Sequence, residues 1–199
     1  MKKTHLLSAA LLAGLLAVTG CKDSADPKAT SSTPSAPVEK VSIPAIATGA
    51  RGFTVGSTMS ARTVYVFFDP QCPHCSALWI AAKPLKSQAK FVWIPVGLIN
   101  PASTSQGAAL LAAPDPAAAM DEHEASMTQK KGGITASGNL DAQKADVEAN
   151  TKLMNRFQFG SVPTIIAKHA VTGDLVVKEG SMATAALANA LGLQAPAGN

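Results

Sequence analysis

Two cysteines separated by two residues, Cys72 and Cys75, are the residues whose types and spacing most plainly allow chemistry. Thiol–disulfide exchange needs a thiolate that attacks and a second thiol that resolves the mixed disulfide. The pair encloses Pro73 and His74 and follows an apolar run, so we expect it at the start of a helix. There the first cysteine faces free N–H groups and the positive end of the helix dipole. We therefore expect Cys72 to be the nucleophile and Cys75 the resolving thiol.

Pro73 and His74 are expected to tune this pair. Proline suits the first helical turn because it lacks the N–H group that would have no partner there. An imidazole beside the thiolate, together with the helix terminus, can lower a cysteine pKa from about 8.5 toward ~3.5–7. A stabilised thiolate favours the reduced protein, which makes the couple oxidising. A structural zinc site is not favoured, because it takes four ligands and the sequence has no second pair of this kind.

The third cysteine, Cys21, closes an N-terminal stretch that is typical of an export signal. Two lysines precede an apolar run at residues 6–18, which is too short for a comfortable membrane span. Residues 18–21 resemble the bacterial lipobox, in which the signal is cut before a cysteine that carries lipid. An ordinary cleaved signal with a chance cysteine is the alternative. Acyl chains on Cys21 would anchor the protein to a membrane, and Lys22 in place of aspartate favours the outer membrane.

Composition divides the chain into three expected parts. Residues 1–20 form the signal, and residues 21–45 carry the lipid and a disordered tether rich in Ser, Thr, Pro and Ala. Residues 46–195 are long enough for one domain with a core. Export removes two of the 17 basic residues and none of the 13 acidic ones, which leaves a net charge of +2. That balance, without a basic cluster, argues against a nucleic-acid partner.

The order of the expected elements is α/β. The apolar run at residues 63–68 predicts a central strand covered on both faces, and Pro84 is expected to kink or end the helix after Cys75. Pro95, in a second strand at residues 91–97, disfavours a place inside the sheet along that part. The remaining expected elements are helices at residues 105–113, 116–130 and 141–157, a hairpin of strands at 164–168 and 175–178, and a last helix that Ser181 caps and that runs to Leu191.

Residues 64–79, VYVFFDPQCPHCSALW, with Pro84 beyond them, resemble the catalytic domain of the DsbC/DsbG periplasmic disulfide isomerases, and that of DsbG most. The likeness covers roughly residues 53–192. Further matching segments lie at residues 96–101, 108–117 and 152–154. The resemblance implies a thioredoxin-like fold with a helical insertion between the CxxC half and the cis-proline half. It also implies the periplasm of a Gram-negative bacterium and no cofactor beyond the redox-active disulfide of Cys72 and Cys75.

The same resemblance directs attention to Val162 and Pro163, which run straight into the apolar strand at residues 164–168. Thioredoxin-like folds set a cis-proline against the CxxC motif at this place. Only ~5–6% of X–Pro bonds are cis by default, so the expectation rests on this context, and a trans proline opening a strand is the alternative. The backbone of Val162 would then pair with a bound peptide next to the disulfide, and the proline would keep metal ions from capturing the dithiol.

The sequence departs from that family at informative positions. The family's isomerases carry an N-terminal dimerisation domain where this chain has the tether, so we expect a monomer. The pair Pro73-His74 and the residue Val162 match the DsbA oxidases instead. Val66 occupies the position at which thioredoxins and oxidases carry a buried acid, so deprotonation of Cys75 would need water or another base. The direction of electron flow, oxidase or reductase/isomerase, therefore stays open.

The expected function is disulfide interchange on exported proteins that carry cysteines. A membrane electron-transfer protein, DsbD-like or DsbB-like, would recharge the dithiol. Two rivals remain: a peptide-holding chaperone, and a copper-handling protein that uses Cys72, Cys75 and His74. The run at residues 121–124, DEHE, is expected to be a solvated helix face and not a metal site, and the two tryptophans are expected in the core or lining a groove.

Overall fold

The computed structural model describes residues 39–196, so the expected signal, Cys21 and most of the expected tether lie outside the described residues. A five-stranded sheet has the order β1-β3-β2-β4-β5. Strands β2 and β3 are parallel, and the other neighbouring pairs are antiparallel. The strands are β1 (Phe53–Gly56), β2 (Thr63–Phe68), β3 (Lys90–Pro95), β4 (Thr164–Lys168) and β5 (Leu175–Glu179). The predicted hairpin is confirmed as β4 and β5.

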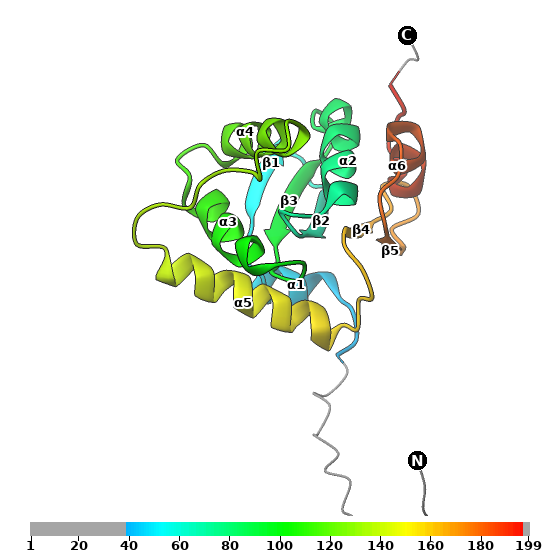
Figure 1. The fold of residues 1–199 in the computed structure, drawn as a ribbon. Coiled ribbons are helices and arrows are strands. Elements are labelled where there is room, and N and C mark those ends of the chain that lie inside the picture. The colour runs from blue at the N-terminus through cyan, green and yellow to red at the C-terminus, as the bar shows by residue number, and fades with distance from the viewer. Residues whose placement is uncertain (1–38, 197–199) are drawn as a thin grey trace, which may run out of the picture. The chain divides into compact units, whose positions relative to one another are not determined.

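Helices cover both faces of this sheet (Figure 1). Side chains of α1 and α5 join one core cluster, and side chains of α2 and α6 join the other. None of the helices within residues 39–196 has the length and apolarity needed to cross a membrane. The helices are α1 (Ile43–Gly49), α2 (Pro73–Ala82), α3 (Pro101–Ala112), α4 (Pro116–Thr128), α5 (Asp141–Arg156) and α6 (Thr184–Leu191), with a 3-10 turn at Lys83–Leu85 after α2.

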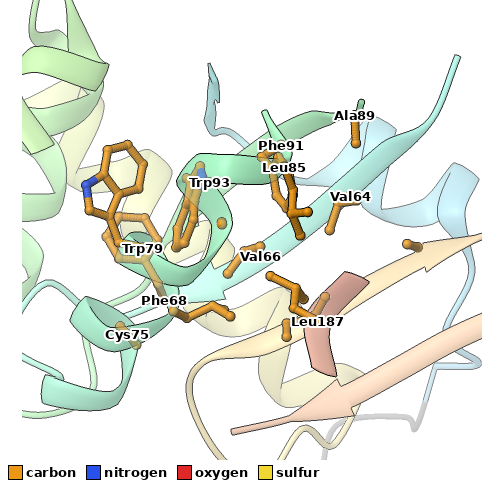
Figure 2. Close-up of a cluster of buried hydrophobic side chains, with 14 of the residues drawn as sticks. Val64, Val66, Phe68, Cys75, Trp79, Leu85, Ala89, Phe91, Trp93 and Leu187 are labelled. Carbon is orange, nitrogen blue, oxygen red and sulfur yellow. The ribbon is translucent and has the colours of Figure 1, made fainter. Parts of the chain in front are cut away.

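The central strand β2 separates the two cores, as its apolar run predicts. Val66 and Phe68 pack into the cluster beneath α2, whereas Phe67 packs into the cluster with α1 and α5. Trp79 of α2 meets Trp93 of β3 edge to face, with ring centroids 5.0 Å apart, so both tryptophans are core residues (Figure 2). Burial of aromatic and β-branched residues on both faces explains why the run at residues 63–68 has no polar alternation.

The order of strands brings two distant segments to one edge of the sheet. The carboxyl end of β2 leads into α2, and α2 returns the chain to β3, which lies parallel to β2. Strand β4 runs antiparallel to β2 with Phe67 opposite Thr164. The start of β4 therefore lies beside the end of β2, although almost a hundred residues separate them. The three helices α3, α4 and α5 form the predicted insertion between these halves.

Two predictions about boundaries are wrong. The expected tether ended at residue 45, but this position lies inside α1, which Ser42 caps by accepting a hydrogen bond from the Ala45 N–H at 3.3 Å. Ile46 is completely buried in the core with α5, so tertiary packing orders a segment whose composition resembles the tether. The last helix begins at Thr184 with no side-chain cap, so Ser181 does not cap it.

The prediction that Pro95 disfavours a place inside the sheet is confirmed for its own part of β3. Strand β3 lies between β1 and β2, but β1 pairs only with residues 90–93 of it. Pro95 is the last residue of β3 and lies beyond the end of β1, so its missing N–H removes no bond from that pairing. Pro84 also ends α2 as predicted, because the chain continues as a 3-10 turn at this point.

Asn150 of α5 is expected to be a main anchor of this fold. Its side chain is fully buried, accepts a hydrogen bond from the Arg51 N–H at 2.8 Å, and donates to the carbonyls of Arg51 and Pro95 at 2.7 and 3.0 Å. Asn150→Ala leaves three backbone groups without partners, so the free energy of unfolding should fall by about 2–4 kcal/mol. Urea denaturation measures this. Asn155→Ala, an exposed position of the same helix, should change stability little, and equal effects of both variants would contradict the prediction.

Candidate active site

The CxxC motif lies at the start of α2, after the loop that follows β2. Cys72 is the N-cap of the helix with extended φ and ψ angles of −93° and 116°, and Pro73 occupies the first turn. The carbonyl of Cys72 accepts the N–H groups of Cys75 and Ser76 at 3.0 and 3.2 Å. Cys72 is 6% exposed and Cys75 only 1% exposed. The structure thus places both sulfurs in the first helical turn, with Cys72 as the more accessible one.

The surroundings of Cys72 favour its thiolate. A hydrogen bond from the Cys75 thiol lowers the pKa of Cys72, burial opposes this, and the backbone N–H groups of Cys75 and His74 lower the pKa further, to about 6. Both N–H groups lie in the first turn of α2, where N–H groups point toward the N-cap residue, and that of Cys75 is shared with the Cys72 carbonyl. The charge of the exposed His74 side chain is the smallest of these contributions. Helix geometry and the second cysteine therefore matter more to the pKa of Cys72 than the imidazole does.

Cys75 has the opposite character. Burial raises the pKa of the Cys75 thiol strongly, and the hydrogen bond that it donates to Cys72 raises it further. Both cysteines are free thiols in this structure. The nucleophile is the thiolate and not the thiol, so at neutral pH Cys72 reacts and Cys75 stays protonated. This difference in pKa is what the predicted roles of nucleophile and resolving thiol require, and the roles themselves stay a prediction.

The Val162–Pro163 peptide bond is cis, as the resemblance implied. The antiparallel pairing of β2 and β4 brings this bond to the CxxC motif, where the Cys72 sulfur lies 3.6 Å from the carbonyl oxygen of Val162. In the thiol form Cys72 donates to this carbonyl. No hydrogen bond within the described part of the chain uses the Val162 N–H. Val162 therefore presents an unused donor beside the reactive sulfur.

Asp69 holds the loop that precedes Cys72, and sequence reasoning assigned it no role. Its carboxylate is completely buried and accepts backbone hydrogen bonds from Gln71 at 2.8 Å, Leu98 at 2.7 Å and Ile99 at 3.0 Å. The Asp69 carbonyl accepts the Cys72 N–H at 3.0 Å. One acidic residue thus ties the loop before Cys72 to the loop that follows β3.

The helical insertion supports the same loop from the other side. Gln71 contacts Gln106 of α3 and the carbonyl of Gly132 through its side-chain nitrogen. His123 of α4 is completely buried; its Nε2–H donates to the Pro70 carbonyl at 2.7 Å, and its Nδ1 accepts the Ile134 N–H at 3.2 Å. These two contacts require the neutral ring with its proton on Nε2.

The prediction that residues 121–124 form a solvated face is wrong for two of the four. Asp121 and Glu122 are exposed, but His123 and Glu124 are buried. Helical spacing gives the reason, because Met120, His123 and Glu124 lie on one face of α4 that packs inward. Glu124 accepts a short hydrogen bond from the Ser76 hydroxyl of α2. Among residues 39–196 no cluster of three His, Cys, Asp or Glu side chains is placed to hold a metal ion.

Glu124 also lines a hollow of about 210 Å³ that opens beside Cys72. Burial raises the pKa of Glu124, the Ser76 hydrogen bond lowers it, and the negative charge of Cys72 raises it. The carboxyl group is therefore coupled electrostatically to the reactive sulfur. The other residues that line the hollow are Pro70, Pro73, Ser76, Met127 and Thr128.

Comparison with known proteins agrees with this geometry. The chain is 36% identical over 104 residues to the thiol:disulfide interchange protein DsbG of Escherichia coli, covering 51% of this chain and 42% of that protein. It is 32% identical over 143 residues to DsbG of Pseudomonas aeruginosa, covering 69% of this chain and 54% of that protein. The chain thus spans about half the length of the curated relatives it matches. No family model matches the sequence.

Solved structures show the fold. The catalytic domain of Proteus mirabilis ScsC has a TM-score of 0.57 at 14% identity, covering 75% of this chain and 96% of that one. A periplasmic thioredoxin-like protein of Salmonella enterica serovar Typhimurium has a TM-score of 0.59 at 15% identity, covering 77% and 97%. The fold class is therefore thioredoxin-like, as predicted. Within that class, the sequence matches confirm the resemblance to DsbG-like thiol–disulfide oxidoreductases.

The pKa of Cys72 gives a first prediction for the site. With a pKa of about 6, roughly nine-tenths of Cys72 is thiolate at pH 7. Iodoacetamide should therefore modify Cys72 rapidly at pH 7 and slowly once the pH falls below 6. The thiolate stabilises the reduced folded protein fully above about pH 8.5, the pKa of a free thiol, and this stabilisation decreases as the pH falls from there and is lost as the pH falls through 6.

Variants separate the causes of this pKa. Cys75→Ala removes the hydrogen bond that lowers the pKa of Cys72 most, so it should raise the measured pKa of Cys72 by about one unit or more. His74→Ala removes a smaller contribution and should raise this pKa less. Thiolate absorbance against pH measures both. A wild-type pKa of 8 or above, or a larger effect of His74→Ala, would contradict this account.

His123 gives a second prediction, on stability. Burial lowers the pKa of His123, so the folded protein resists protonation that the unfolded chain accepts below about pH 6.5. The free energy of unfolding should therefore decrease from pH 7 to pH 5. His123→Gln keeps a donor and an acceptor but cannot titrate, and should show a smaller decrease. In His169→Gln, a control at another histidine, the wild-type decrease should persist, and thermal unfolding at each pH provides the comparison.

Proposed function

We propose that the chain is an exported thiol–disulfide oxidoreductase that works on proteins carrying cysteines. The observation that carries this proposal is the position of Cys72, a helix N-cap thiolate whose sulfur lies 3.6 Å from the carbonyl before a cis-proline. A structural disulfide would need neither an accessible thiolate nor an adjacent unused backbone donor. The sequence similarity to DsbG, a thiol:disulfide interchange protein, supports the same activity.

The chemistry follows from the two pKa values. The Cys72 thiolate attacks one sulfur of a substrate disulfide, a bond forms between the two sulfurs, and the other substrate sulfur leaves as a thiolate that takes a proton from solvent. Cys75 then gives its proton to water and attacks the Cys72 sulfur, which releases the second substrate sulfur as a thiolate that takes a proton from solvent and leaves the Cys72–Cys75 disulfide. The substrate gains two electrons, and the dithiol loses two. The reverse sequence oxidises a substrate dithiol.

The substrate backbone would lie along Val162. Its N–H has no partner within residues 39–196, and its carbonyl, which accepts from Cys72 only when that sulfur is a thiol, is available when Cys72 is a thiolate or part of a mixed disulfide. An extended peptide can use such groups as an added strand does. Leu98 and Ile99, in the loop that Asp69 anchors, are 46% and 50% exposed and supply apolar surface near the site.

The pKa of Cys72 also supports a direction. A value of about 6 lies closer to thioredoxin, at about 7, than to the oxidase DsbA, at about 3.5. Because a more stable thiolate makes a dithiol more oxidising, we expect a reduction potential of about −200 to −250 mV, between the potentials of these two proteins. This favours reduction or isomerisation of substrates over net oxidation.

The proposal also includes the cellular location of the chain and its electron donor. A lipid on Cys21, which lies outside the described residues, would hold the domain at the periplasmic face of a Gram-negative membrane, with Lys22 favouring the outer membrane. A membrane electron-transfer protein, DsbD-like in the reductive direction, would reduce the disulfide again. Mass spectrometry of the membrane-extracted protein tests the lipid, and sedimentation tests the expected monomer.

The decisive measurement is equilibration of the full chain with glutathione redox buffers. The fraction of Cys72–Cys75 disulfide should give a potential of about −200 to −250 mV, and the reduced protein should turn over a peptide disulfide with glutathione as electron source. A potential near −120 mV would instead indicate an oxidase.

The variant Cys72→Ser/Cys75→Ser separates catalysis from the two rivals. It should lose turnover entirely while staying folded. If it still protected unfolded proteins from aggregation, and the wild type showed no turnover, the peptide-holding chaperone would be the better account. Stoichiometric Cu(I) uptake by the reduced wild type without turnover would favour copper handling.

A further inference from the structure

The hollow beside Cys72 has the chemistry of a subsite for a basic side chain. We infer that it receives a lysine or arginine side chain next to the substrate's cysteine, with Glu124 as the group that binds the cation. This inference rests on the proposed function and adds a substrate preference to it. It depends on the position, the lining and the charge of the hollow.

The hollow lies directly beside the reactive sulfur. Cys72 itself lines the hollow, so a side chain within it lies next to the sulfur that forms the mixed disulfide. Neither Val162 nor Pro163 lines the hollow. A substrate backbone along Val162 therefore leaves the hollow free. Its volume of about 210 Å³ suits one long side chain and not a second length of peptide.

The residues that line the hollow suit a long side chain with a charged end. Pro70, Pro73 and Met127 provide apolar and polarisable walls, whereas Ser76 and Glu124 provide polar groups. Lysine and arginine combine an aliphatic stem with a charged head, and such side chains bury the stem along apolar surface while the head meets a polar partner. Aliphatic side chains would leave the carboxyl group without a cationic partner, and acidic ones would be repelled by it.

Glu124 provides an acidic group in the hollow that no cation of the described residues pairs with. Glu124 is 6% exposed, and no salt bridge to it exists among the described residues. The charged groups around it are the Cys72 thiolate, Lys83 and Asp121, and Lys83 is already paired with Asp121 at 2.6 Å. The Ser76 hydroxyl donates to the carboxyl group and fixes its orientation. A buried acid held in place but left without a cation is suited to accept one from a ligand.

A bound cation would also act on the reaction. Negative charge on Glu124 and on Cys72 disfavour each other, which is one reason why the pKa of Glu124 is raised. A lysine or arginine head between them favours both anions. Substrates with a basic residue beside the cysteine should therefore bind more tightly and react faster; because about nine-tenths of Cys72 is already thiolate at pH 7, a further rise in that fraction adds little there.

The test uses three peptides that differ only in the residue next to one cysteine, which is Lys, Gln or Glu. Each cysteine carries 2-nitro-5-thiobenzoate as a mixed disulfide, so attack by Cys72 releases a coloured thiolate. The full-length reduced chain should react with the Lys peptide about tenfold faster than with the Glu peptide at low salt, with the Gln peptide between them, and high salt should reduce the ratio.

Three variants locate the preference. Glu124→Gln should reduce the ratio between the Lys and Glu peptides to about twofold or less. Glu122→Gln, an exposed acid of the same helix, should keep the wild-type ratio. Met127→Lys leaves Glu124 intact but places a cation of the chain itself in the hollow, and should also abolish the preference. This third variant gives a result even if Glu124→Gln does not fold.

The outcomes are distinct. Equal rates for the three peptides on the wild type would overturn the subsite and leave the proposed oxidoreductase standing. A preference that survives both Glu124→Gln and Met127→Lys would also overturn it, because the selectivity would then arise elsewhere. No reaction with any peptide would overturn the proposed function, and the subsite with it.

Discussion

The reactive cysteine depends on the way in which one short loop is held. Residues 69–71 connect the central strand to α2, and the buried Asp69 carboxylate accepts three backbone N–H groups, two of which come from the loop after β3. Several backbone hydrogen bonds compensate a buried carboxylate well, whereas a carboxylate without them is costly. The direction of α2, and hence the N–H groups that face the Cys72 sulfur, follows from this anchor.

The insertion has a structural purpose that its position between the two halves does not reveal. Helices α3 and α4 place Gln106 and His123 against Gln71 and Pro70, so the loop before Cys72 is supported from both sides. The ring of His123 accepts one backbone N–H and donates to one carbonyl, which leaves it no capacity for a second proton. A helical segment far away in sequence therefore contributes to the order of the reactive turn.

Local signals explain which features the sequence predicts. Cys72, Cys75 and Pro163 stand at element boundaries with residue types that few other roles require, and the central strand is a continuous apolar run. The strand β1, four residues long, acquires its identity from pairing with β3, and α1 from the burial of Ile46; both depend on contacts distant in sequence. His123 and Glu124 share an inward face with Met120, so helical spacing could have identified them.

The electrostatics of the site bear on why the pKa of Cys72 lies between those of the cysteines in thioredoxin and DsbA. Thioredoxins and oxidases place a buried acid in the strand beneath the motif, but Val66 occupies that position here and packs into the core. The acids nearest the motif are Asp69, committed to backbone donors, and Glu124, which borders the accessible side of Cys72. The negative charge near the sulfur is therefore on the side that a substrate approaches.

The pKa of Cys72 reflects opposing effects of its surroundings. The Cys75 thiol and the helix N–H groups lower the pKa of Cys72, while burial acts against the thiolate, and the charge of Cys72 in turn raises the pKa of Glu124. A thiolate loses intrinsic nucleophilicity as its pKa falls, and the best attacking thiol has a pKa near the ambient pH. A pKa of about 6 keeps most of Cys72 ionised at neutral pH while retaining much of its reactivity. The acid beside Cys72 thus coexists with a reactive nucleophile, and the cost of two neighbouring negative charges is seen in the raised pKa of Glu124.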